Sequence, residues 1–157
     1  MKRKKVIKTI IILGIIAFMT GGGIGLYLFN MPHRDVQSAK VDYSLTSSQI
    51  VSEYLSNREA ANQKYLAADG DSKILEISGE VDKISEDFTG QKVVLLKSAG
   101  DKAGVSATFT KKTNTKLSGL QKGNLITVKG VIRAGASYDE DLELYENVIL
   151  EKSDIVK

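Results

Sequence analysis

The chain has 157 residues and a formal net charge of +3, from 22 lysines and arginines against 19 acids. Five of these cations lie in residues 1–9 and no acid precedes Asp35, so residues 10–157 carry a small excess of acids over cations. A domain with that charge lacks the basic surface typical of nucleic-acid-binding proteins. The absence of cysteine excludes disulfides, thiolate metal sites and a lipid-bearing cysteine.

The first predicted element is an uncharged apolar segment, residues 10–29. As a helix with a rise of about 1.5 Å per residue, it would span the roughly 30 Å core of a bilayer. The cationic segment 1–9 predicts a cytoplasmic N-terminus, a single anchor in the cytoplasmic (inner) membrane and a C-terminal domain on the periplasmic or extracytoplasmic side. The alternative is a cleaved signal peptide, with small residues at 20–23 near its cleavage site. Both alternatives predict export of the remaining chain.

Residues 30–44 have the composition of a linker. They are mostly polar and contain the only proline, Pro32, and the only histidine, His33. A single histidine without convergent partners indicates a solvated loop residue rather than a metal ligand or a base. We therefore expect no catalytic or metal-binding residue in this segment.

Residues 45–70 are predicted to form one amphipathic helix. Thr46 and Gln49 have the spacing of a capping box at its start, and Gly70 is the residue type that commonly follows a helix. Apolar residues recur between them at helical spacing, namely Ile50, Val51, Tyr54, Leu55, Ala61, Tyr65 and Ala68. This apolar stripe needs another element to cover it.

Residues 71–152 change to a period of two, which predicts β-strands. The first strand, 74–84, places Leu75, Ile77 and Val81 on one face, with Gly79 among them. Further strands are predicted over 91–97, 104–111, 123–133 and 142–152, with a short helix within 113–120. This order is that of an OB-fold, a five-stranded Greek-key barrel, and a five-stranded sandwich is the alternative.

Two glycines have a predicted role in closing the barrel. A glycine weakens a strand unless it marks a bulge, a bend or a close approach of another segment. Because strands of a small barrel must bend sharply, we expect Gly79 in the first strand and Gly130 in the fourth to mark such bends.

Three stretches carry a family resemblance: "NREAANQKY" (57–65), "ILEISGEVDKI" (74–84) and "LQKGNLITVKGVI" (120–132). They resemble the tRNA_anti-like OB-fold proteins, small anchored or exported proteins of bacterial envelopes, over residues 45–151. The resemblance implies a mainly β fold, in which an OB-fold barrel follows an amphipathic helix and an N-terminal transmembrane helix. It implies no catalytic residues, and the family name is no evidence for tRNA binding.

An OB-fold binds ligands on the face of its second and third strands and on two adjoining loops. This predicts an envelope binding module with a protein or glycan ligand, whose surface comprises Phe88, Lys92, Lys97, Ser106, Thr108, Thr110 and Tyr138. The alternative ligand is a single-stranded nucleic acid. We expect it less because the candidate loops contain Glu86, Asp87 and the acids at 139–141, which would repel phosphates.

The sequence predicts no enzymatic activity, cofactor or metal site. It contains no cysteine, one isolated histidine and no paired carboxylates at a catalytic spacing. Asp139, Asp141 and Glu143 alternate as weak Ca²⁺ ligands would, but a dedicated calcium loop also contains a turn glycine. We therefore interpret these acids as a solvated loop.

Overall fold

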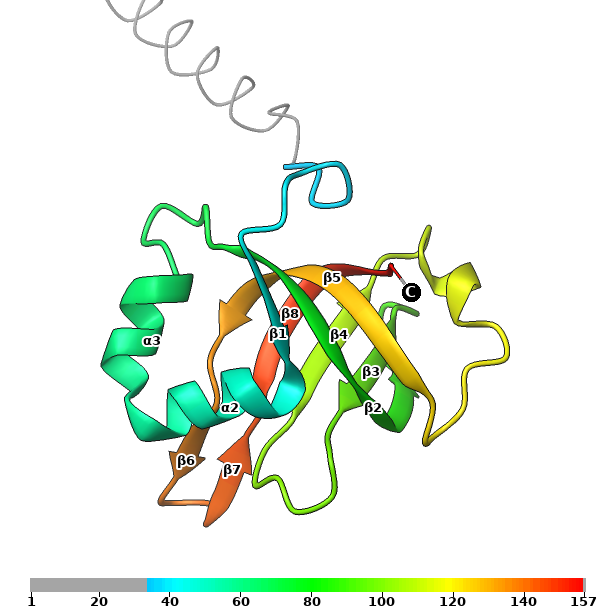
Figure 1. Cartoon of the computed structure of the whole chain (residues 1–157). Coiled ribbons are helices and arrows are strands. Elements are labelled where there is room, and N and C mark those ends of the chain that lie inside the picture. Colours follow the sequence, from blue (N-terminus) through cyan, green and yellow to red (C-terminus); the bar gives the residue numbers. More distant parts are fainter. Residues whose placement is uncertain (1–33, 157) are drawn as a thin grey trace, which may run out of the picture. The chain divides into compact units, whose positions relative to one another are not determined.

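The computed structural model describes residues 34–156 (Figure 1). The predicted basic segment 1–9, the predicted anchor 10–29 and the first residues of the predicted linker, 30–33, lie outside the described residues. The elements in chain order are β1 (Tyr43–Thr46), α2 (Ser47–Ser56), α3 (Arg58–Tyr65), β2 (Ile74–Glu86), β3 (Lys92–Leu96), β4 (Val105–Phe109), η1 (Asn114–Leu117), β5 (Leu125–Ala134), β6 (Ser137–Asp139), β7 (Leu144–Glu146) and β8 (Val148–Ile155).

Five strands close into a barrel in the order β2-β3-β4-β8-β5, and pairing of β5 with β2 completes the ring (Figure 1). Neighbouring strands are antiparallel except β4 and β8, which are parallel. The 3₁₀ helix η1 lies between β4 and β5, as the short predicted helix does. The predicted OB-fold barrel is therefore confirmed for the described residues.

Strand β2 changes its partner near its middle. Residues 74–80 pair with β5, whereas residues 81–86 pair with β3. Gly79 lies at this change, and a Cβ built there would be 2.7 Å from Ser47 Oγ and 3.0 Å from Leu96 Cβ. Because these distances are shorter than normal contacts, a glycine is needed for the start of α2 to approach the strand.

Gly130 occupies a comparable point in β5. The register between β5 and β8 shifts between Lys129 and Val131. A Cβ at position 130 would be 2.8 Å from Ser153 Oγ and 3.0 Å from the carbonyl oxygen of Glu151. Both predicted glycines therefore lie where strand pairing is irregular and another segment comes close.

The barrel interior is filled by alternate residues of the strands. Fully buried positions include Leu75, Ile77, Val81, Val94, Leu96, Val105, Ala107, Phe109, Ile132 and Leu150. Ile50, Tyr54 and Tyr65 of the two helices belong to the same cluster. Because burial of one such side chain contributes about 1.5–3 kcal/mol, this shared core holds the helices on the barrel.

The structure differs from the single helix predicted over residues 45–70. Helix α2 ends at Ser56 and α3 begins at Arg58, with Asn57 between them at a φ of −154°. The Asn57 side chain accepts a hydrogen bond from the N–H of Ala60 at 3.0 Å. Asparagine is a strong N-cap residue, so this side chain starts a new helix in a new direction.

The start of α2 is as predicted, but what precedes it is not a linker. Thr46 and Gln49 form the predicted capping box, with both hydrogen bonds present. Strand β1 takes its first two residues from the predicted linker and its last two from the start of the predicted helix, and it pairs in parallel with β2. Farther upstream, Val36 is buried against Ile74 and Val131 of the barrel.

A buried lysine fixes the same upstream segment. The ammonium group of Lys129 donates a hydrogen bond to the carbonyl oxygen of Gln37 at 2.9 Å and a second to that of Ala39. Because these carbonyl oxygens lie in a turn that starts at Asp35, the compact unit begins at about that residue.

The fifth predicted strand, 142–152, also differs. Its first part turns outward as β7 and pairs with β6, whereas only its second part enters the barrel, as β8. Leu142 and Leu144, in the first part of this predicted strand, have exposed fractions of 67% and 46%. Val148 and Leu150, in the second part, are buried.

Candidate ligand-binding cleft

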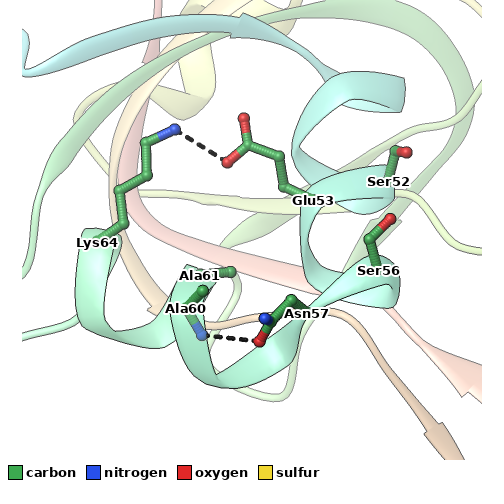
Figure 2. A pocket seen from close by; sticks show the side chains of 7 residues that line it. All are labelled: Ser52, Glu53, Ser56, Asn57, Ala60, Ala61 and Lys64. Atoms are coloured by element: carbon green, nitrogen blue, oxygen red, sulfur yellow. Dashed lines mark hydrogen bonds and ion pairs between the residues drawn. The ribbon is translucent and has the colours of Figure 1, made fainter.

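Several hollows lie beside the helices in the described part of the chain, and two of them are lined by residues of both helices. The first, of about 340 Å³, is at the corner between α2 and α3 (Figure 2). Its charged side chains, Glu53 and Lys64, form an ion pair at 3.0 Å, and the Asn57 side chain caps α3. Because these three side chains already bond to partners within the chain, few polar groups of this hollow remain available to bind a ligand.

The second hollow, of about 370 Å³, lies between the helices, the loop after β3 and the β6–β7 hairpin. We call it the tyrosine cleft. Its lining residues are Tyr54, Leu55, Arg58, Lys102, Ala136, Ser137, Tyr138 and Tyr145. Figure 1 shows the hairpin projecting from the barrel close to α2.

Two tyrosines form one wall of the cleft. The ring centroids of Tyr138 and Tyr145 are 4.8 Å apart, with 51° between the ring planes. Tyr138 is 48% exposed, and the ammonium of Lys102 lies 5.4 Å from the Tyr145 ring centroid. An exposed aromatic pair beside a cation presents an apolar surface with polar groups at its edge.

The hairpin places these two rings together through its register and its turn. Tyr138 and Tyr145 are directly opposite each other across β6 and β7. In the turn, the Asp139 carboxylate accepts a hydrogen bond from the N–H of Asp141 at 2.9 Å, and Glu143 has a left-handed φ of 51°. Such side-chain-to-backbone bonds and left-handed residues are typical of tight turns.

Tyr54 and Ala136 form the floor of the cleft, since both line it and both are almost fully buried. A Cβ built on Gly135 would be 1.8 Å from Cε1 of Tyr54. The Tyr54 ring thus lies directly against the backbone of the loop between β5 and β6. Only glycine at position 135 leaves room for that ring.

The electrostatics of the cleft combine neutral, cationic and acidic groups. Burial, together with the nearby Tyr65 and Glu53, raises the pKa of Tyr54 to about 12, so the Tyr54 hydroxyl keeps its proton. Arg58 and Lys102 are exposed at the rim. The neighbouring hairpin carries the carboxylates of Asp139, Glu140, Asp141, Glu143 and Glu146. The rim is cationic, but its surroundings are acidic.

A family model described as tRNA_anti-like matches residues 1–142. The chain belongs to the tRNA_anti-like family. This confirms the resemblance seen in the sequence, and the family match includes Tyr138 of the cleft but ends before Tyr145.

The same barrel occurs in a solved structure from Klebsiella pneumoniae subsp. pneumoniae, described as a "putative nucleic acid-binding lipoprotein". It is 18% identical, the match covers 81% of this chain and 100% of that chain, and the TM-score is 0.52. At that identity the likeness shows the fold alone. A search of curated proteins finds no match to the sequence. Within residues 34–156, no helix of this tRNA_anti-like protein has the length and apolar character needed to cross a bilayer.

Of the predicted surface residues of this tRNA_anti-like protein, Tyr138 alone lines the tyrosine cleft. Phe88 is fully exposed in the turn before β3. Lys97 lies after β3 and faces a separate hollow, together with Asp82 and Lys122. Since Phe88 precedes β3 and Lys97 follows it, the two residues lie at opposite ends of that strand.

The other four predicted residues lie elsewhere on the barrel. Ser106 and Thr108 are half-buried on the outer face of β4. Lys92 and Thr110 lie near η1, where the N–H of Lys92 donates to Asn114 Oδ1 at 3.0 Å. These six residues thus lie on β3, β4 and the segments that adjoin them, outside the lining of the tyrosine cleft.

Sequence reasoning missed most of the cleft in this tRNA_anti-like protein. Tyr54 was assigned to the apolar stripe of a helix, and Arg58 to none of the candidate surfaces. One signal was available for Tyr145: the segment "SYDEDLELYE" (137–146) reads as two short strands around an acidic turn, with Tyr138 and Tyr145 paired.

Proposed function

We propose that this protein is a non-catalytic binding module of the cell envelope, which holds a glycan or a protein segment in the tyrosine cleft. The observation that carries the proposal is the half-exposed ring of Tyr138, paired with Tyr145 beside Lys102. Tyrosines that combine an apolar ring with a hydroxyl group are enriched at binding sites. Arg58 and Lys102 add hydrogen-bond donors at the rim.

A location in the envelope is part of the proposal. It is supported by the predicted export of the chain and by the description of the Klebsiella structure as a lipoprotein. A reporter fused after Lys157 tests the predicted topology. We expect activity from a reporter that works only outside the cytoplasm, whereas activity from a cytoplasmic reporter would contradict export.

Single-stranded nucleic acid is the second candidate ligand. The paired tyrosines resemble the stacking surfaces that bind bases, and the Klebsiella structure is described as nucleic acid-binding. The carboxylates of the hairpin oppose it, because they would repel the phosphates of a strand that lies across the cleft. We therefore place a glycan or protein ligand first.

A retention experiment with the full chain in detergent tests the role of the cleft. The wild type and two variants, Tyr138→Ala and Phe88→Ala, are immobilised and exposed to solubilised cell-wall glycan, to envelope proteins and to a labelled oligothymidine. Phe88 is the matched control, since it is an exposed aromatic residue outside the cleft. We expect Tyr138→Ala to lose a ligand that the wild type and Phe88→Ala retain.

Equal retention by all three proteins would contradict a role for the cleft. Retention of the oligothymidine that depends on Tyr138 and weakens steeply with salt would favour the nucleic-acid candidate instead.

A further inference from the structure

The hydroxyl group of Tyr54 is buried at the floor of the tyrosine cleft without a hydrogen-bond partner among the described residues. The side chain is 1% exposed, and its ring is fixed by contact with Gly135. A buried hydroxyl that makes no hydrogen bond lowers the stability of a protein. Phenylalanine would fill the same space without that cost.

Tyr65 provides an internal comparison. It is also fully buried, and its ring centroid is 6.0 Å from that of Tyr54. Its hydroxyl, however, donates a hydrogen bond to Glu53 Oε2 at 2.8 Å. Of these two neighbouring tyrosines, the one that lines the cleft is thus the one whose hydroxyl lacks a partner.

The surroundings of this hydroxyl restrict what can bind to it. Because the hydroxyl keeps its proton, it can donate to an acceptor such as a carbonyl oxygen. Leu55 and Ala136, which line the same cleft, are apolar and suit a small methyl group. Tyr138 and Tyr145 present ring faces on which the C–H face of a sugar can pack.

We propose that the ligand is a glycan of N-acetylated sugars, whose acetamido carbonyl accepts a hydrogen bond from the Tyr54 hydroxyl while a sugar ring packs on Tyr138. This inference rests on the proposed function of the cleft. The acetamido methyl group lies against Leu55 and Ala136. Because the Tyr54 hydroxyl is buried when no ligand is present, the ligand reaches it as the cleft opens at that atom. A neutral glycan is also not repelled by the carboxylates of the hairpin.

The experiment measures calorimetric binding of two neutral tetrasaccharides to the full chain in detergent. One is the β-1,4-linked tetramer of N-acetylglucosamine, and the other is the β-1,4-linked tetramer of glucose, which has a hydroxyl in place of each acetamido group. We expect binding of the N-acetylated tetramer and much weaker binding of the glucose tetramer. Absence of binding of the first, or equal binding of both, would overturn the proposal.

Two matched Tyr→Phe variants test the hydroxyl itself. Tyr54→Phe should weaken binding of the N-acetylated tetramer about fivefold to tenfold, as expected for one lost hydrogen bond, with an unchanged or higher melting temperature. Tyr65→Phe should leave the affinity unchanged and lower the melting temperature, because it removes the bond to Glu53. Unchanged affinity in Tyr54→Phe would overturn the contact.

The two proposals fail in different ways. If Tyr138→Ala weakens binding but Tyr54→Phe does not, the cleft binds a ligand and the hydroxyl is not involved. If Tyr138→Ala leaves all retention unchanged, the proposed function itself is wrong. Binding of a pentaglycine peptide in place of the N-acetylated tetramer would assign the cleft to protein segments and reject the glycan.

Discussion

Gly135 leaves room for the Tyr54 ring to pack against the backbone, and its substitution gives a prediction at the scale of one residue. A methyl group at position 135 would come within 1.8 Å of the Tyr54 ring. Gly135→Ala should therefore reduce the free energy of unfolding by about 1–3 kcal/mol, the usual cost of overpacking. Chemical denaturation of the purified chain measures this difference.

A double-mutant cycle separates this contact from a general effect on the loop. In a Tyr54→Leu background the smaller side chain leaves space for the new methyl group. Gly135→Ala should then cost at least about 1 kcal/mol less than in the wild type, because residues in contact are not additive. Additive losses would show that the Tyr54 ring is not the obstacle.

The glycines also show what sequence can reveal about single residues. Gly79 was recognisable because it interrupts a well-patterned strand, and the structure places it where β2 changes partner. Gly135 lies in a loop, where glycine is unremarkable in sequence. Glycine is required there because the Tyr54 ring packs against it. Tyr54 is distant in the chain, so the sequence around position 135 does not indicate the requirement.

The corner between α2 and α3 gives a prediction at the scale of elements. The Glu53 carboxylate accepts hydrogen bonds from Lys64 at 3.0 Å and from the Tyr65 hydroxyl at 2.8 Å. Burial acts to raise the pKa of Glu53, but these hydrogen bonds outweigh it, so the pKa lies below its ordinary value of 4.5. The ionised form of Glu53 therefore stabilises the folded chain.

The lowered pKa of Glu53 determines how the stability of the folded chain depends on pH. A carboxyl with a lowered pKa contributes stability that is complete above its ordinary pKa and is lost as pH falls through the folded-state value. Glu53→Gln should thus be less stable than the wild type at pH 7, and the difference should shrink as the pH falls below 4.5. Thermal unfolding from pH 7 to pH 3 measures the difference, and a constant difference would contradict the assignment.

The helices also show why the elements were only partly predictable. The helical spacing of the apolar residues and the capping box were readable, and both are confirmed. The break at Asn57 was not, because asparagine also occurs inside helices at moderate cost. The hairpin of β6 and β7 was hidden because its alternating Leu142 and Leu144 looked like a continuation of the barrel strand.

Lys129 gives a prediction at the scale of the whole domain, because it joins the upstream turn to the barrel. Lys129→Met keeps an unbranched side chain of similar volume but removes the hydrogen bonds to the carbonyl oxygens of Gln37 and Ala39. We expect a loss of about 1–3 kcal/mol, as for hydrogen bonds to a charged group. Cleavage by trypsin after Lys40 should also become faster, because the turn is released.

The control is Lys122→Met, which removes an exposed ion pair with Asp82. Surface ion pairs contribute little, so this variant should lose less than about 1 kcal/mol and leave cleavage after Lys40 unchanged. Equal effects of the two substitutions would show that the Lys129 contact does not hold the turn.

For the domain as a whole, the order of the strands and of η1 was sufficient to predict an OB-fold, and this is confirmed. The candidate site was not predictable to the same degree. Its lining comes from α2, α3, the loop after β3 and the β6–β7 hairpin, which meet only in the folded chain. Tyr138 was found because it is an aromatic residue in a segment predicted to join two barrel strands, a property visible in that segment alone.

The position of β8 leaves two strands of the barrel without one of their partners while the chain is being synthesised. This strand lies between β4 and β5 and supplies the shared partner of both. Synthesis runs from the N-terminus, so both strands leave the ribosome before the residues that will join them. Until Ile155 has been added, β4 and β5 each have an edge available for pairing with other chains, which is the type of edge from which aggregation starts.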